Sequence, residues 1–156
     1  MIWKELNKKL IMTDLDAKNY DEVMEKLGGL LIKEGYCKET YVDALKEREA
    51  EYPTGLDIEG VGVAIPHTPV THVLRHAIAI ARLQNPVEFI QMGSEDETTN
   101  VKIVFMLAVD DPNAHIDQLQ EILKIIQDKK VLMELAETKD ADEINNIIKE
   151  KEKENN

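Results

Sequence analysis

The sequence has little that could crosslink the chain or anchor it in a membrane. Cys37 is the single cysteine among 156 residues, which excludes an internal disulfide, a thiol redox pair and a thiolate metal site, so we expect it to be inert. No uncharged apolar run approaches the roughly 20 residues that cross a bilayer. Residues 1–10 carry alternating Lys and Glu, unlike a signal peptide. The sequence therefore predicts a cytoplasmic protein.

Positive charge is also scarce. The chain has 19 Lys and Arg against 31 Asp and Glu, which gives a formal net charge of −12 at pH 7. Because nucleic acids and anionic membranes are bound largely through Lys and Arg, this balance argues against both as partners. Much of the acidic excess lies at residues 143–154, where we expect a frayed, solvated end that confers solubility. Steering of a basic protein partner is the alternative.

Apolar periodicity predicts two helices in the first third of the chain. Residues 20–34 place their large apolar side chains on one helical stripe, and Gly35 follows as a natural stop. Residues 38–52 repeat the pattern more weakly until Pro53 breaks it. This second helix places Arg48 near its C-terminus.

Three further helices are expected in the last third, at residues 116–126, 131–135 and 143–150. The apolar face of the first comprises Ile116, Leu119, Ile122, Leu123 and Ile126. Asp140 followed by Glu143 resembles a capping box at the start of the last helix.

The middle of the chain changes to strand periodicity. Residues 61–65 form a short apolar run that ends at Pro66, which cannot donate a ladder hydrogen bond. Residues 76–83 and 101–109 predict two more strands, the second buried on both faces, with a polar loop at 93–100 between them. Helices, then strands, then helices predict a single α/β domain with a small mixed β-sheet flanked by helices.

His67 follows the first strand end directly. A side chain there is held by a rigid sheet while it faces the solvent edge, a position that favours function. Neutral imidazole is nucleophilic near pH 7, so His67 could attack a phosphorus centre. From position alone, the alternative is a partly exposed histidine that hydrogen-bonds the local turn between Pro66 and Pro69.

Two segments resemble motifs of one known family. The phosphorylation-site motif of the fructose/mannitol-type IIA components of bacterial phosphotransferase systems is similar to Val63-Ala64-Ile65-Pro66-His67-Thr68. The segment that precedes it in the galactitol-like branch is similar to Arg48-Glu49-Ala50-Glu51-Tyr52-Pro53-Thr54-Gly55-Leu56. The resemblance covers about residues 10–148, including a stretch at 111–123 similar to the one that carries the family's second active-site histidine. It implies one IIA-type phosphocarrier domain over residues 1–156.

That resemblance implies a phosphoryl relay in sugar uptake. His67 would accept phosphate on Nε2 from the phosphocarrier protein HPr and pass it to a cysteine of a IIB component, which phosphorylates sugar entering through the IIC membrane channel. The permease would be galactitol- or fructose-like, and the sugar would be selected chiefly by IIB and IIC. No cofactor and no metal are implied.

The same match assigns roles around the phosphoryl group. Arg48 corresponds to the family's active-site arginine, whose guanidinium pairs with phosphate oxygens; alternatively it neutralises adjacent glutamates at a helix end. His115 corresponds to the second histidine, which donates a hydrogen bond to the phosphoryl group and is not phosphorylated. The galactitol-like branch does not always keep that histidine, so a position without function near a helix start is the alternative. Thr68, next to His67, could add a hydroxyl donor.

Two other functions stay open from the sequence. A regulatory IIA-like phosphoprotein would use the same chemistry to control a transporter or transcription factor, because regulatory IIA proteins share the motif. A histidine-dependent hydrolase or metal enzyme would need a carboxylate partner or ligand cluster, and neither occurs at recognisable spacing. His72 and His76 stand four apart, but in a strand that offset separates side chains by about 13 Å. We therefore expect them to be surface residues.

Overall fold

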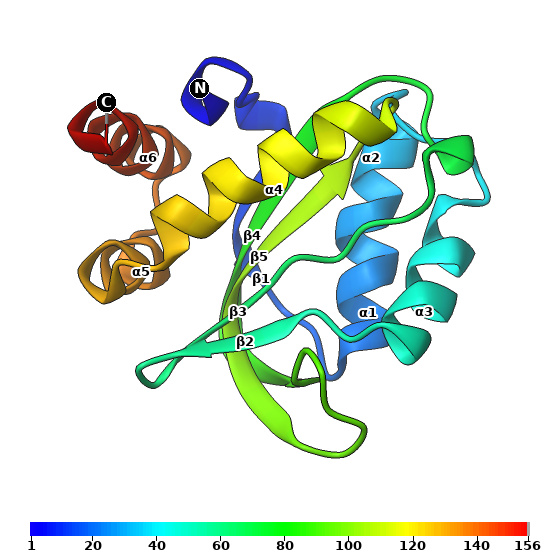
Figure 1. Cartoon of the computed structure of the whole chain (residues 1–156), viewed down its shortest axis with the longest axis horizontal. Coiled ribbons are helices and arrows are strands. Elements are labelled where there is room, and N and C mark those ends of the chain that lie inside the picture. The colour runs from blue at the N-terminus through cyan, green and yellow to red at the C-terminus, as the bar shows by residue number, and fades with distance from the viewer. Residues whose placement is uncertain (156) are drawn as a thin grey trace.

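The structure, a computed structural model, describes residues 1–155 and is organised around one five-stranded sheet (Figure 1). The strands are β1 (Ile11–Leu15), β2 (Gly55–Ile58), β3 (Val61–Ala64), β4 (Ala77–Ile90) and β5 (Thr98–Ala108), in the order β1-β4-β5-β3-β2. β1 runs parallel to β4 and β3 to β5, whereas β4 is antiparallel to β5 and β2 to β3. The predicted α/β class with a mixed sheet is confirmed.

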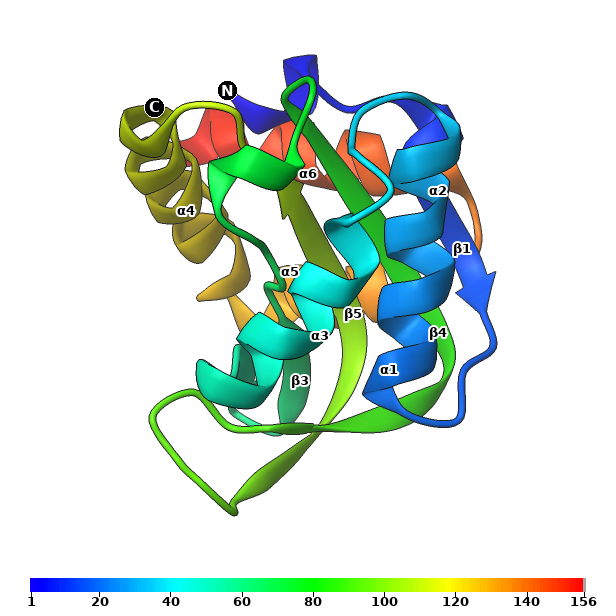
Figure 2. The same ribbon diagram turned by 90° about the vertical axis from the view of Figure 1, so that its right-hand side faces the viewer.

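Helices cover both faces of the sheet (Figures 1 and 2). On one face lie α1 (Tyr20–Val23), a π-helical turn (Met24–Gly28), α2 (Gly29–Lys33) and α3 (Tyr41–Glu51). On the other lie α4 (Pro112–Ile126), α5 (Lys129–Glu137) and α6 (Ala141–Asn155). Short 3-10 turns occur at Ile2–Lys4, Lys8–Leu10 and Val70–His72. Each face packs its own apolar core, so the central strands β4 and β5 are buried on both sides over much of their length. Among the described residues, no helix combines the length and apolarity needed to cross a bilayer.

The helix predicted at residues 20–34 is confirmed, with a π turn inside it that packs against α3. A Cβ at Gly28 would lie 2.8 Å from Leu45 Cδ1, so a larger residue there would force a shift. Gly35 ends the helix with φ +84°, a left-handed conformation that glycine adopts without strain. α3 begins at Tyr41, later than predicted, and Arg48 lies in its last turn as expected.

Two boundaries in the middle of the chain differ from the prediction. β4 continues beyond its predicted end to Ile90, because its ladder with β5 resumes at Val87 after an irregular, exposed stretch that accommodates Pro86. β5 begins at Thr98, so part of the predicted loop at 93–100 is strand. A long β4–β5 hairpin therefore forms the centre of the sheet.

The buried face of α4 is also rotated relative to the prediction. Ile116 is 57% exposed, whereas Ile122, Ile125 and Ile126 are buried. The first turn of α4 directs His115 toward the pocket described below. Since consecutive helical residues are about 100° apart, the next side chain then faces solvent.

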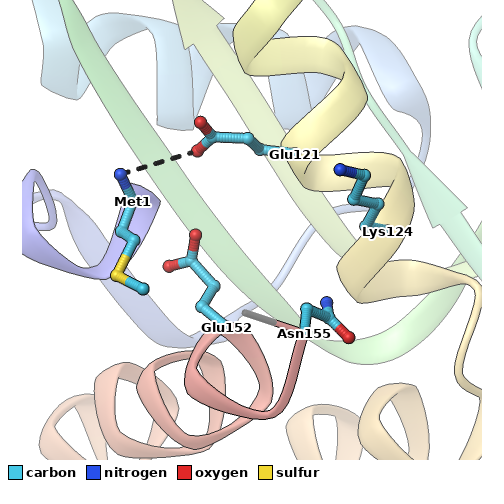
Figure 3. A pocket seen from close by; sticks show the side chains of 5 residues that line it. All are labelled: Met1, Glu121, Lys124, Glu152 and Asn155. Carbon is cyan, nitrogen blue, oxygen red and sulfur yellow. Dashed lines mark ion pairs between the residues drawn. The ribbon is translucent and has the colours of Figure 1, made fainter.

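The acidic C-terminal segment is helical, so the expected frayed end is wrong, although Glu143, Glu150 and Glu154 are exposed as expected. Within α6, Glu152 is only 6% exposed. Its carboxylate accepts hydrogen bonds from the backbone N–H groups of Ile2 (2.9 Å) and Trp3 (2.7 Å), which begin the first 3-10 turn. Figure 3 shows Glu152 near Met1, whose amino group lies 3.9 Å from a Glu121 carboxylate oxygen. Segments from opposite ends of the chain are thus joined.

Asp140 accepts a hydrogen bond at the start of α6, but the predicted capping box is incomplete. Its Oδ1 accepts the N–H of Asp142 at 2.9 Å. The N–H of Asp140 donates to Thr138 Oγ1 at 3.2 Å, so this donor is already used and does not bond Glu143 as a capping box requires.

We expect Glu152→Gln to destabilise the fold by about 2 kcal/mol, the range for hydrogen bonds to a charged group. The amide keeps one acceptor oxygen but turns an NH2 group toward a second backbone donor. Denaturant unfolding at pH 7 measures the change. Glu150→Gln is the matched control, because Glu150 is exposed on the same helix. Equal unfolding midpoints for the two variants would contradict this role of Glu152.

Candidate active site

The backbone around His67 is fixed where β3 ends. Pro66 has no N–H, but its carbonyl accepts a hydrogen bond from the N–H of Leu107 in β5 (3.0 Å), and His67 pairs with Leu107 in an isolated bridge. The Leu107 carbonyl accepts the buried Tyr41 hydroxyl of α3 at 2.7 Å. The chain beyond β3 is therefore tied both to the sheet and to a helix that packs on it.

The His67 ring is held in one tautomer. Nδ1 lies 3.0 Å from the Ile65 carbonyl oxygen, which is only an acceptor, so Nδ1 carries the proton and Nε2 keeps its lone pair. Burial lowers the pKa of His67 to about 4, with smaller contributions from the charges of His115 and Arg48, while the bond to Ile65 opposes the shift. The imidazole is therefore neutral and nucleophilic at pH 7.

His115 comes from the first turn of α4 and packs against His67. The two ring centroids are 4.6 Å apart and the ring planes are inclined at 45°. Asp111 caps α4 through its side chain and Pro112 follows, which fixes this turn. Burial, followed by the charge of Arg48, lowers the pKa of His115, which favours a neutral ring with one N–H left to donate.

Arg48 brings a positive charge to the same place. Its guanidinium carbon lies 4.9 Å from the centre of the Tyr52 ring. Within residues 1–155 its buried Nε has no hydrogen-bond partner, and no carboxylate forms an ion pair with the guanidinium. The neighbouring glutamates therefore do not pair with Arg48 in this structure. An anion in front of Arg48 would supply the missing acceptor.

These three side chains face one pocket of about 310 Å³. Its lining residues are Arg48, His67, Thr68, Pro69, Val70, Val109, Pro112 and His115. Apolar side chains thus surround a nucleophilic nitrogen, a guanidinium and a second imidazole. The arrangement is suited to hold a small anion at a nucleophile while restricting water around it.

Residues 4–151 match a family described as "Phosphoenolpyruvate-dependent sugar phosphotransferase system, EIIA 2". The chain belongs to this family. It is a IIA phosphotransferase component of the fructose/mannitol type, as the motifs predicted. Among its relatives, the galactitol-specific EIIA component of Escherichia coli K12 is 32% identical over 120 residues, which cover 75% of this chain and 79% of the relative.

Solved structures share the IIA fold. The mannitol IIA of Escherichia coli, determined in complex with phosphorylated IIB, has a TM-score of 0.77 at 25% identity, covering 93% of this chain and 97% of that one. The nitrogen regulatory protein IIA-Ntr of Neisseria meningitidis has a TM-score of 0.74 at 24% identity, covering 94% and 98%. The fold is thus common to a mannitol component and a nitrogen regulatory protein.

The IIA pocket also contains Thr68, but its hydroxyl proton is already engaged. Thr68 is buried and donates to the Pro69 carbonyl at 2.9 Å. Donation to a phosphoryl oxygen would require that bond to be exchanged. The predicted role of Thr68 stays a prediction.

The other reactive side chains are absent from the lining of this pocket. His72 Nδ1 lies 2.8 Å from Thr40 Oγ1, and His76 Nε2 lies 3.1 Å from a Glu5 carboxylate oxygen. Both histidines are partly buried, so the expectation of surface residues is only partly correct.

Across residues 1–155, no three or more His, Cys, Asp and Glu side chains are grouped to hold a metal ion. Cys37 is buried, and burial raises the pKa of its thiol to about 12, so it stays protonated.

Sequence reasoning missed the residues that hold His67 in place. Tyr41 lies within the weak helical pattern of residues 38–52, which does not reveal that its hydroxyl bonds the strand beside His67. Thr54 and Glu49 were part of a family-like segment without roles of their own. A threonine that directly precedes a strand, as Thr54 precedes β2, is the signal that could have drawn attention to this pair.

The His67 imidazole should titrate near pH 4, well below the ordinary value of 6.5. The unfolded chain then binds a proton at His67 from about pH 6.5 downward, whereas the folded chain does so only near pH 4. His67 therefore reduces stability as the pH falls through this window, and His67→Gln should be less acid-sensitive there. NMR titration of the ring, with unfolding curves at several pH values, measures both effects. A ring that titrates near pH 6.5 would overturn the assignment.

Proposed function

We propose that this IIA component accepts a phosphoryl group on Nε2 of His67 from phospho-HPr and passes it to a cysteine of a IIB component of a galactitol- or fructose-like permease. The observation that carries the proposal is the bond from His67 Nδ1–H to the Ile65 carbonyl. It leaves Nε2 as the reactive nitrogen, in a pocket that also contains the unpaired guanidinium of Arg48.

In both phosphoryl transfers the proton on His67 Nδ1 stays in place, and only the bonds to Nε2 change. In the first, the Nε2 lone pair forms a bond to phosphorus while the bond from phosphorus to the HPr leaving group breaks. Because both ring nitrogens are then substituted, the His67 ring carries a positive charge, which the Ile65 carbonyl dipole stabilises. In the second, a IIB thiolate forms the S–P bond while the Nε2–P bond breaks, and the electron pair returns to Nε2.

Arg48 and His115 would stabilise the charge on the phosphoryl oxygens during both steps. A guanidinium donates two parallel hydrogen bonds to phosphate oxygens and stays charged throughout. A neutral His115 retains one N–H to donate. Together they would supply the charge stabilisation that Mg²⁺ supplies in nucleotide-dependent kinases.

The galactitol-specific relative supports the proposed permease class, and the mannitol IIA structure in complex with phosphorylated IIB supports the proposed acceptor. The apolar lining of the pocket suits a transient contact that excludes water while phosphate moves between proteins. A regulatory function is the second candidate, favoured by the fold shared with IIA-Ntr. Phosphate passage to a IIB protein encoded with this chain would distinguish the two.

Incubation with phosphoenolpyruvate, enzyme I and HPr should add one acid-labile phosphate to the wild-type protein, detected by intact-mass spectrometry. His67→Gln should take up none, because it lacks the nucleophilic nitrogen. His72→Gln is the matched control, since His72 is outside the lining of the pocket, and it should be labelled like the wild type. Labelling of His67→Gln would refute the assignment.

Arg48→Gln should slow phosphoryl transfer from phospho-HPr by roughly 100-fold, the cost of removing one preorganised charge-stabilising donor. Arg48→Lys should lose less, because it keeps the charge but not the paired donors. Rapid-quench measurement of single-turnover rates checks this. Arg75→Gln is the control, because that guanidinium stacks on Tyr36, 4.3 Å from the ring centre. Equal rates for Arg48→Gln and Arg75→Gln would exclude the role.

A further inference from the structure

A buried carboxylate and a buried threonine form a closed pair behind the His67 loop. Glu49 and Thr54 are each only 5% exposed. The Thr54 backbone N–H donates to one Glu49 carboxylate oxygen at 2.7 Å, and the Thr54 hydroxyl donates to the other at 2.8 Å. Burial raises the pKa of Glu49, while the two bonds from Thr54 oppose this change. Both acceptor oxygens are therefore committed to one residue.

The Thr54 hydroxyl also extends the sheet by one bond. In the β2–β3 ladder, Gly55 pairs with Ala64 at the end where β3 leaves the sheet. The next N–H along the chain, just beyond the end of β3, belongs to Ile65, and it donates to Thr54 Oγ1 at 3.2 Å. Because the hydroxyl proton is committed to Glu49, its lone pairs point toward this donor. Glu49 thus orients the Thr54 hydroxyl so that its oxygen accepts the hydrogen bond from the Ile65 N–H.

Ile65 is the residue whose carbonyl orients the His67 ring. Its N–H is held by Thr54, and the proline that follows restricts Ile65 to extended backbone conformations. On the opposite side, the Pro66 carbonyl is held by Leu107. The acceptor of the His67 Nδ1 proton therefore sits on backbone that is anchored from both neighbouring strands.

We propose that Glu49 and Thr54 are positioning residues for phosphoryl transfer, which hold the Ile65 carbonyl so that His67 keeps its proton on Nδ1 and presents Nε2 to the pocket. This inference rests on the proposed function for its kinetic consequence. Its structural part, control of the His67 tautomer, does not depend on which protein donates or accepts phosphate.

Thr54→Val tests the proposal, because valine has the shape of threonine but neither accepts from Ile65 nor donates to Glu49. We expect the His67 ring to show a mixture of tautomers in ¹⁵N NMR spectra at pH 7, and the single-turnover rate with phospho-HPr to fall roughly 10-fold to 100-fold, as for a misplaced reacting group. Thr54→Ser restores the hydroxyl and should restore both the tautomer and the rate.

Glu49→Gln provides a second variant that keeps side-chain volume. Glutamine offers one acceptor oxygen where Thr54 needs two, so the hydroxyl loses its fixed direction. A smaller change in the tautomer mixture than in Thr54→Val, with a correspondingly smaller loss of rate, is expected. This variant also carries the test should Thr54→Val fail to fold.

Glu152→Gln controls for stability, because it weakens the fold at the α6 contact and leaves the His67 loop unchanged. The proposal is supported when Thr54→Val changes tautomer and rate while Thr54→Ser and Glu152→Gln do not. Wild-type tautomer and rate in Thr54→Val, or equal loss in Glu152→Gln, would overturn it. If the wild type accepts no phosphate at all, the proposed function fails, and the NMR comparison alone decides whether this pair positions His67.

Discussion

The hydrogen bond from His67 Nδ1–H to the Ile65 carbonyl, 3.0 Å between heavy atoms, determines which ring nitrogen the pocket receives. With the proton on Nε2, the pocket would receive an N–H group and no nucleophile, beside the guanidinium of Arg48. With the proton on Nδ1, the same pocket receives the Nε2 lone pair beside that guanidinium. The difference is a single proton, and backbone geometry decides its position.

The pocket around His67 forms because α3, α4 and the end of β3 meet at one place. α3 lies on one face of the sheet and provides Arg48, whereas α4 lies on the other face and provides His115 (Figures 1 and 2). The strand end between them provides His67. Arg48 and His115 reach the same pocket as His67 only when both helical layers are packed on the sheet. Burial of both cores therefore positions the side chains that line the pocket as well as stabilising the fold.

Local signals in the sequence are enough to predict the helices at both ends and the strand end at Pro66 that places His67, whereas Arg48 and His115 are singled out only by the resemblance to the IIA family. These local signals fail where a contact joins distant segments. The Glu152 carboxylate accepts donors about 150 positions away in the sequence, so composition alone suggested a solvated tail. Ile116 is exposed because its neighbour His115 faces the pocket, which turns the next side chain of the helix toward solvent. The roles of Glu49 and Thr54 depend on how two strands are paired, which periodicity does not reveal.

The electrostatic environment of His67 affects both steps of the proposed relay, the acceptance of the phosphoryl group and its release. In the free protein, burial and the charges around it lower the pKa of His67, so a proton does not compete for Nε2 at neutral pH. A phosphoryl dianion arriving at the same nitrogen would meet Arg48, which opposes a proton but attracts an anion. The weak basicity that keeps Nε2 available also makes the ring a good leaving group, because a nitrogen that binds a proton weakly also releases phosphorus readily. In the proposed relay, one environment would thus keep Nε2 free to accept the phosphoryl group and ready to release it, as a reversible carrier needs.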